Sequence, residues 1–188
     1  DHSLNFNYMR VRQNSHLVFA PAELLKREVW LPATSALRPE LSNQFSASWN
    51  GSFADGKYTA ETNVYYKKME HLVTLKEGYE NMVEITGIEN KIESDGKGSA
   101  YGAEFMVKKN TGKWTGFVAY ASSHADRTFA NINGGKTYEF DYNRPHSFTL
   151  NANRDLGKNW TMSAVWIVQS GTPYTPALGK YFTFNPET

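Results

Sequence analysis

The feature that most constrains this chain is a period-two alternation of apolar and polar residues over long runs. Successive side chains of a β-strand point to opposite faces of a sheet, so this alternation predicts strands with one apolar and one polar face. Helical periodicity is nearly absent, and the one candidate helix, Ala22–Arg27, would have only a turn or two. The sequence therefore predicts an all-β chain. Seven runs show the strand pattern: 4–14, 40–53, 57–75, 99–110, 113–127, 146–155 and 159–172.

Six of these runs have an apolar side whose central positions carry no charge. In the second run this side holds Leu41, Phe45, Ala47, Trp49 and Phe53. Charged residues alternate to the opposite side, as Glu61, Lys67, Glu104 and Lys108 do. A Lys or Arg that faces lipid near the bilayer midplane costs about 2–4 kcal/mol. The uncharged side therefore suits contact with hydrocarbon.

The lengths of the runs and of their connections favour a membrane barrel. Globular strands typically have about 5–6 residues, whereas about 9–11 tilted residues cross a bilayer. Short turns with Gly beside Asp, Asn or Thr lie at 54–57, 110–113 and 155–159. They alternate with long connections at about 15–39, 76–98 and 128–145. Outer-membrane barrels have this asymmetry, with short periplasmic turns and long extracellular loops. The sequence predicts an antiparallel meander of about seven long strands, part of a transmembrane β-barrel.

Two alternatives fit the same alternation. A soluble β-sandwich or barrel, such as a carbohydrate-binding module, would also have an uncharged core face. A small self-contained membrane barrel is possible if residues 181–188 add an eighth strand. Two features favour the larger membrane barrel over the soluble module: the polar side is rich in Ser, Thr, Asn and Gln, and aromatic residues gather near the short turns. These aromatic residues are Trp49, Phe53, Tyr58, Trp114 and Trp160.

Composition excludes several classes of protein. Lys and Arg number 20 against 19 Asp and Glu, so no basic footprint indicates nucleic-acid binding. Cysteine is absent, which excludes disulfide frameworks and thiolate chemistry. A mean hydropathy of −0.58 and the lack of a long apolar run exclude a transmembrane helix.

Seven antiparallel strands cannot close into a barrel with an even strand number. We therefore expect residues 1–188 to be a segment of a single transmembrane β-barrel domain, truncated at both ends.

Several stretches resemble one family of outer-membrane proteins. Lys97–Phe105 resembles a strand start of the form G-x-a-Y-G-x-E, and Trp114–Ser123 resembles the strand that follows it. Asp141–His146 resembles a y-D-x-x-H strand entry, and Gln169–Pro176 resembles an S-G-x-P-y-T-x-P strand exit. In this order, from about Gln13 to Gly179, the sequence is similar to the barrel of TonB-dependent receptors, in the branch common among Bacteroidetes-type bacteria.

The resemblance implies a fold, a location and a set of partners. The family has a 22-stranded barrel in the bacterial outer membrane, with an N-terminal plug and a TonB box, and it imports scarce nutrients. The implied partners are membrane lipid, the remaining barrel and plug of the same chain, the TonB complex acting through the plug, and a small nutrient ligand. Neither a plug nor a TonB box is found in these residues. The transported ligand cannot be read from the sequence.

The sequence gives no support for an enzyme, a metal site or a cofactor. Its five histidines never form a paired ligand spacing such as H-x-x-x-H. His146 opens a strand and is interpreted as an anchor of the preceding loop. Glu61 and Glu104 share the polar side and have the residue types of a glycosidase pair, but inward carboxylates of a wide barrel more often pair with neighbouring lysines. We therefore expect no catalytic residues.

Ligand contact is expected in the long connections. Their exposed aromatic residues offer a flat apolar surface with a polar edge, which suits sugars, peptides or chelates. The same residues would also serve to pack one loop against another. The candidate ligand-binding residues are Trp30, Tyr79, Tyr138 and Tyr142.

Overall fold

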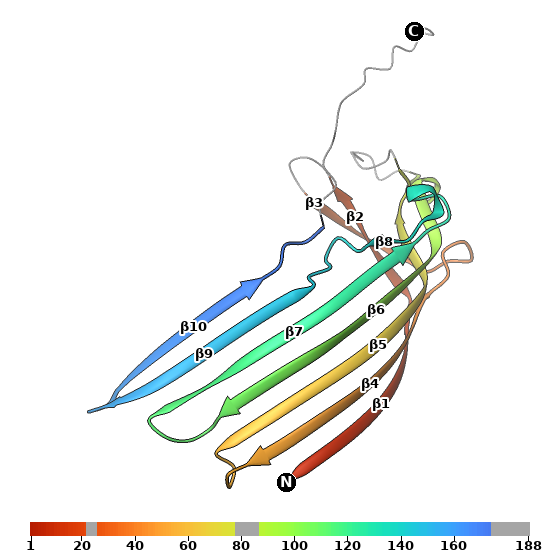
Figure 1. The fold of residues 1–188 in the computed structure, drawn as a ribbon. Coiled ribbons are helices and arrows are strands. Elements are labelled where there is room, and N and C mark those ends of the chain that lie inside the picture. The colour runs from red at the N-terminus through yellow and green to blue at the C-terminus, as the bar shows by residue number, and fades with distance from the viewer. Residues whose placement is uncertain (22–25, 78–86, 174–188) are drawn as a thin grey trace, which may run out of the picture.

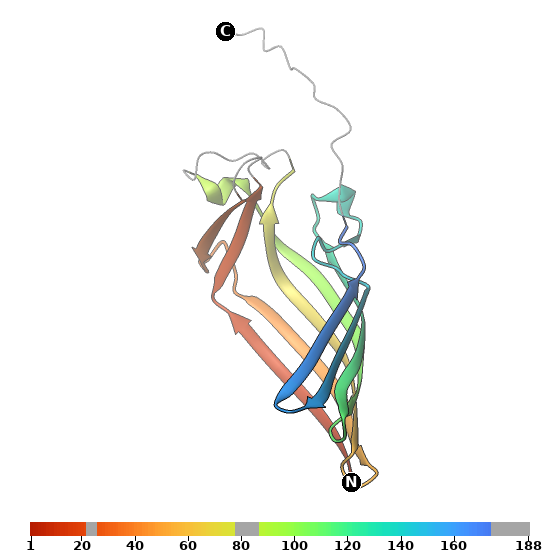
Figure 2. The same ribbon diagram turned by 90° about the vertical axis from the view of Figure 1, so that its left-hand side faces the viewer.

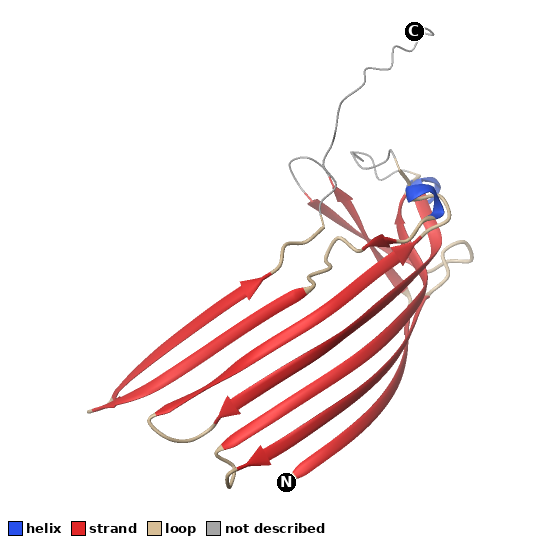
Figure 3. Cartoon of the chain, viewed as in Figure 1, coloured by secondary structure: helices blue, strands red, loops and turns tan. Residues whose placement is uncertain are grey.

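The computed structural model of the chain describes residues 1–21, 26–77 and 87–173. Seven long strands form one antiparallel meander in which each strand pairs with the next (Figure 1, Figure 3). The predicted all-β meander is confirmed, with strand ends within a few residues of those expected except at β6, which begins earlier. The order across the sheet is β1 (His2–Gln13), β4 (Glu40–Phe53), β5 (Tyr58–Leu75), β6 (Ile92–Lys109), β7 (Trp114–Thr128), β9 (His146–Gly157) and β10 (Trp160–Gln169).

The remaining elements all lie at the end of the sheet with the long connections, called here the long-loop end (Figure 1). β2 (Ser15–Pro21) and β3 (Lys26–Pro32) form a separate hairpin, and β8 (Tyr138–Glu139) pairs with β7. Two 3-10 turns, η1 (Ile88–Lys91) and η2 (Asn133–Gly135), complete the connections. No described helix is long and apolar enough to cross a membrane.

The predicted helix Ala22–Arg27 is wrong in the part that the structure describes. Lys26 and Arg27 belong to β3 and pair with Pro21 and Ala20 of β2, while residues 22–25 lie outside the described residues. Local helical propensity is a weak preference, and pairing with a neighbouring strand overrides it. The connection that was expected to be a loop therefore contains a β-hairpin.

The short turns form at the opposite end of the sheet, as predicted. Ala54, Asp55 and Gly56 have φ values of 51°, 54° and 82°, and the Lys57 N–H donates to Ala54 O at 3.1 Å. Gly112 has a φ of 106°. Positive φ at these positions matches the right-handed twist of the strands that each turn joins. The turn chemistry thus places every long connection at one end.

Strand register aligns the apolar positions of neighbouring strands into rows. Phe45 lies opposite both Tyr8 and Tyr66, and Tyr66 lies opposite Tyr101. The next strands continue the face in a neighbouring row, because Tyr120 lies opposite both Phe105 and Phe148. Cross-strand neighbours of this kind share one face of a sheet. The predicted apolar face therefore runs without interruption across the whole meander.

This apolar face is the exposed face of the wall. On the inner strands, Phe45 is 57% exposed and Tyr101 is 49% exposed. On β5 the apolar Val64 and Tyr66 are exposed, whereas Tyr65 on the polar face is half-buried. The sheet curves across its strands (Figure 2), and side chains on the inside of a curve cover one another. The polar face is therefore the concave one.

A soluble sandwich would cover the apolar face with a second sheet. The only other sheet among the described residues is the two-stranded β2–β3 hairpin, and the apolar residues of the wall remain open. The eight-stranded self-contained barrel depended on residues 181–188, which lie outside the described residues.

A small hydrophobic core is found only at the long-loop end of the described chain. Val18 of β2 and Leu37 pack with the last residues of β5 and the first residue of β6. Burying each such aliphatic side chain contributes about 1.5–3 kcal/mol. This core fixes the β2–β3 hairpin against the wall. Its members are Val18, Leu37, Val73, Leu75 and Ile92, with Leu31 packed against them.

A β-bulge at His71 marks the change from open wall to packed core. His71 has a φ of 60°, and the register shifts between Glu70 and Leu72. A one-residue shift moves the following side chains to the other face. Leu72 therefore lies on the concave side, where its Cδ1 is 2.9 Å from the place that a Cβ on Gly98 would occupy. Beyond the bulge, apolar residues pack inward.

The substitution Gly96→Ala tests this packing, because a Cβ at position 96 would overlap the ring of the buried Phe129. We expect Gly96→Ala to lower the free energy of unfolding by about 1–3 kcal/mol, the usual cost of an overfilled site. Urea unfolding of the detergent-folded protein, followed by tryptophan fluorescence, measures this loss. Gly171→Ala is the control, since nothing lies within 4 Å of its added Cβ. An equal loss in a Phe129→Ala background would contradict the proposed overlap.

Candidate functional site

The long-loop end brings together a cluster of polar residues that sequence reasoning did not select. Glu40, at the start of β4, contacts His16 of β2, and its charge raises the pKa of Arg127 near the end of β7. Residue parity places Glu40 and Arg127 on the concave face, so their side chains converge as the sheet curves. We call His16, Glu40 and Arg127 the mouth cluster. It connects the β2–β3 hairpin to the far side of the described wall.

His16 is the most buried member of the mouth cluster, with an exposed fraction of 0%. Its Nδ1 lies 3.2 Å from Glu40 Oε1, whose side chain is 25% exposed. Its Nε2 is buried and has no hydrogen-bond partner among the described residues. A buried polar atom without a partner costs about 1–3 kcal/mol. Because Nε2 has no partner among the described residues, the contact with Glu40 is the one hydrogen bond that holds the His16 ring there.

Arg127 is held over an aromatic ring on the neighbouring connection. Its Cζ lies 3.7 Å from the centre of the Phe140 ring, within the range of a cation–π interaction. Burial lowers the pKa of the Arg127 guanidinium, while the negative groups of Tyr138, Glu40 and Asp141 oppose that effect. Arginine keeps its charge under these conditions. Arg127 is therefore a largely buried cation that lies over the Phe140 ring and feels the charges of Glu40 and Asp141.

Tyr138 is one of the predicted ligand-binding residues, and the structure places it beside Arg127. It pairs with Arg127 in the short β7–β8 ladder and is half-buried. Burial raises the pKa of the Tyr138 phenol, Arg127 lowers it, and the carboxylates of Asp141 and Glu77 raise it. The phenol is therefore neutral and available as a hydrogen-bond donor at physiological pH.

The other predicted residues lie apart from one another. Tyr142 is 54% exposed and packs edge-on against Phe140 at 5.3 Å, which connects it to Arg127 through that ring. Trp30 is 61% exposed on β3, on the separate hairpin. Tyr79 lies outside the described residues. The structure thus joins Tyr138 and Tyr142 around one arginine and leaves Trp30 on the opposite hairpin.

The connection 129–145 is anchored by its own polar residues. Asn143 is 2% exposed, and its Oδ1 accepts the Ala125 N–H at 3.0 Å. His146 Nδ1 lies 2.7 Å from the Tyr120 hydroxyl, and the His146 N–H donates to Ser170 Oγ at 2.9 Å. These bonds tie the connection to both neighbouring strands, and they agree with the interpretation of His146 as a loop anchor.

The chemistry of this end is suited to binding. Within residues 1–21, 26–77 and 87–173, no three His, Asp or Glu side chains come together as metal ligands would. The mouth cluster was missed because Glu40 and Arg127 are 87 positions apart in the sequence, and curvature alone brings them together. The alternation of side chains could have indicated the cluster, because it places both residues on the polar face at the long-loop ends of their strands.

Glu40→Gln tests the anchoring of the β2–β3 hairpin. The loss of this carboxylate removes the polar partner of His16 and a charge partner of Arg127. Hydrogen bonds to charged groups contribute about 1.5–3 kcal/mol, so amides of residues 15–32 should exchange about tenfold faster or more. Hydrogen exchange with mass spectrometry measures this change. Glu61→Gln, on the polar face nearer the short turns, serves as the control, and equal exchange in both variants would contradict the anchoring role.

Comparison with known proteins agrees with this geometry. A family model described as "TonB dependent receptor-like, beta-barrel" matches residues 21–186. No curated protein and no solved structure matches the chain. The match covers nearly the whole chain, and the long antiparallel strands, the exposed apolar face and the one-sided long connections are those of a bacterial outer-membrane barrel. The chain therefore belongs to the TonB-dependent receptor-like β-barrel family, a family of outer-membrane receptors and transporters.

Proposed function

We propose that this chain forms part of the wall and of the extracellular mouth of a receptor that captures a small nutrient ligand and imports it actively. The remaining barrel and the plug of the same protein would complete the pore, and the TonB complex would supply energy through the plug. In this proposal residues 1–188 lie within a single barrel domain, whose long-loop end is extracellular.

The observation that carries this proposal is the set of polar side chains on the concave face, which is densest on β4 and β9 and leads from the mouth cluster toward the short turns. On these two strands the concave positions are mostly Ser, Asn, Thr and Gln, whose side chains exchange hydrogen bonds with water and with sugar-like or peptide-like ligands at little cost. Asn153 Nδ2 donates to Asn151 Oδ1 at 2.7 Å on this face. A polar interior of this kind supports passage of a hydrated ligand. Central members of the face include Ser46, Ser48, Asn63, Ser123, Thr149 and Asn151.

Ligand capture is proposed at the aromatic residues that rim the mouth. Trp30 and Tyr142 are more than half exposed and stand on two different connections. Tyr138 would supply a phenol donor beside Arg127, and Tyr79 completes the proposed set. Two aromatic surfaces on opposed connections allow a ligand to be gripped from both sides.

The proposed rim is tested by uptake in a strain that lacks this receptor. Growth on iron chelates, cobalamin, glycans and peptides as single nutrients should fail for one of them and recover with the wild-type gene. Trp30→Ala and Tyr142→Ala should weaken ligand binding by about tenfold each, as expected for exposed aromatic anchors. Phe53→Ala, at the short-turn end, is the control. Uptake that persists without TonB would contradict active import.

The proposed orientation of the wall is tested by nitroxide probes at Ala164 and Ser163 of β10. These neighbours alternate, so Ala164 belongs to the apolar face and Ser163 to the polar face. In the whole receptor in lipid, oxygen should relax the probe at 164, and an aqueous nickel chelate should relax the probe at 163. If the nickel chelate relaxed the probe at 164 and oxygen relaxed the probe at 163, the apolar face would line the interior, and the proposed orientation would be contradicted.

A further inference from the structure

The concave face of the wall has a hollow on the short-turn side of the mouth cluster. The hollow has a volume of about 520 Å³ and lies where Gly102 of β6 provides no side chain between its partners, Tyr65 of β5 and Ser123 of β7. The Ser123 N–H donates to Pro145 O at 3.1 Å, so Pro145 completes the row toward β9. All four residues line the hollow, and all belong to inner strands of the described sheet or to the connection between two of them.

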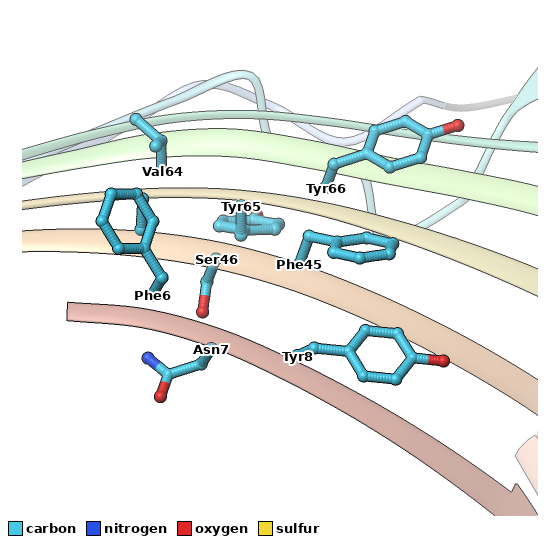
Figure 4. Close-up of a pocket in the computed structure, with 9 residues that line it drawn as sticks. Phe6, Asn7, Tyr8, Phe45, Ser46, Val64, Tyr65 and Tyr66 are labelled. Carbon is cyan, nitrogen blue, oxygen red and sulfur yellow. The ribbon is translucent and has the colours of Figure 1, made fainter.

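The Tyr65 ring forms one wall of this hollow. A Cβ on Gly102 would lie 2.8 Å from the Tyr65 hydroxyl oxygen and 2.9 Å from its Cε1, so the ring leans across the place where a side chain would stand. Figure 4 shows Val64 and Tyr66 on one side of the wall and Ser46 on the other. Ser46 is the cross-strand partner of Tyr65, and both lie on the concave side. The hollow therefore presents an aromatic ring with a hydroxyl edge to the interior.

Two opposite charges flank the hollow along the direction of the strands. Lys67 lies two residues beyond Tyr65 toward the mouth, and Glu104 lies two residues beyond Gly102 toward the short turns. Both therefore keep the concave facing of the row between them. Lys67 pairs with Ala100, which is four residues from Glu104 along β6. The backbones of the two charged residues are thus separated by about 13 Å along the ladder.

Neither charge is neutralised by the described part of the wall. The sequence led us to expect inward carboxylates to pair with neighbouring lysines, yet Lys67 and Glu104 form no ion pair and no side-chain hydrogen bond among the described residues. The residues between them, Tyr65, Gly102 and Ser123, carry no charge. The hollow therefore has a positive end toward the mouth, a neutral middle and a negative end toward the short turns.

This order of charges fits a short peptide with free ends. A peptide carries a carboxylate and an ammonium group at its two termini at neutral pH. Two or three extended residues span about 7–11 Å, and the long side chains of Lys67 and Glu104 cover the rest of the distance between their backbones. The apolar groups between the termini suit an aromatic ring with a polar edge. A neutral sugar would use the ring but leave both charges without a partner.

We propose that this hollow binds a peptide of two or three residues with free termini. The peptide carboxylate lies at Lys67 and its ammonium group lies at Glu104. The middle of the peptide packs on the Tyr65 ring over Gly102. The Tyr65 hydroxyl, which has no hydrogen-bond partner among the described residues, donates to a peptide carbonyl. The peptide site rests on the proposed function, because it names the class of nutrient that the receptor imports.

The experiment measures the affinity of the whole receptor for trialanine by isothermal titration calorimetry in detergent. Trialanine should bind. Its C-terminal amide and its N-acetylated form should each bind about tenfold more weakly, because each lacks one charged terminus and therefore one charge-assisted hydrogen bond.

Two substitutions assign each terminus to its partner. Lys67→Gln should weaken the binding of trialanine about tenfold and leave the affinity for the amide unchanged, since the amide has no carboxylate for Lys67 to contact. Glu104→Gln should weaken the binding of trialanine equally and leave the affinity for the acetylated form unchanged. Lys68→Gln is the matched control, because Lys68 lies on the convex face beside Lys67 and its Nζ is 3.3 Å from Glu70 Oε1. This control should bind trialanine as the wild type does.

Failure of trialanine to bind, equal binding of the free and blocked peptides, or equal affinity of the Lys67→Gln and Lys68→Gln variants would overturn the proposal. Each of these results would mean that another occupant, such as part of the plug, fills the hollow. Growth of the strain that lacks the receptor separates this failure from that of the proposed function. If growth is lost only on a nutrient other than peptides, active import stands and the peptide site fails. If trialanine binds as expected but enters cells equally well without TonB, the peptide site stands and active import fails.

Discussion

The structure depends on a register that keeps the apolar side chains of seven strands on the same face. Phe45 of β4 meets Tyr8 and Tyr66, and the alignment passes strand by strand to Leu150 and Trp166. A slip of one residue in any ladder would expose its polar residues to lipid and its apolar residues to the interior. Because the backbone bonds of each strand are satisfied only by its neighbours, register and membrane compatibility are a single constraint.

The bulge at His71 shows where that constraint ends. Within the membrane the environment outside the wall is apolar, so large hydrophobic residues point outward. Beyond it both sides face water, and apolar residues gain only by packing together. The positive φ of His71 moves Leu72 to the concave side, and Val73 and Leu75 then join the core that holds the β2–β3 hairpin. Two register shifts of β5, between Glu70 and Leu72 and between Leu72 and Thr74, therefore separate the wall from the packed long-loop end.

The mouth cluster and the open apolar face follow from the same curved sheet, but on opposite sides of it. Curvature brings the concave side chains of Glu40 and Arg127 together and spreads the convex side chains of Phe6 and Val64 apart. Near the mouth, the buried Arg127 feels the charge of Glu40, which raises the pKa of the guanidinium and opposes the effect of burial. Divergence leaves the large apolar side chains of the convex face open between neighbouring rows. The wall thus offers a polar binding surface inside and an apolar one outside.

The sequence by itself determined the strands, their facing and the end at which the turns lie, because alternation and turn chemistry act between residues close in the chain. The prediction that Trp30, Tyr79, Tyr138 and Tyr142 bind ligand came from their aromatic side chains and their place in the long connections, and it stays a prediction. Only the tertiary structure decided that β2 and β3 pair as a hairpin, that His16 is buried against Glu40, and that Arg127 completes the cluster. These contacts join residues far apart in sequence, and their geometry depends on sheet curvature and on the bulge at His71, which no local pattern encodes.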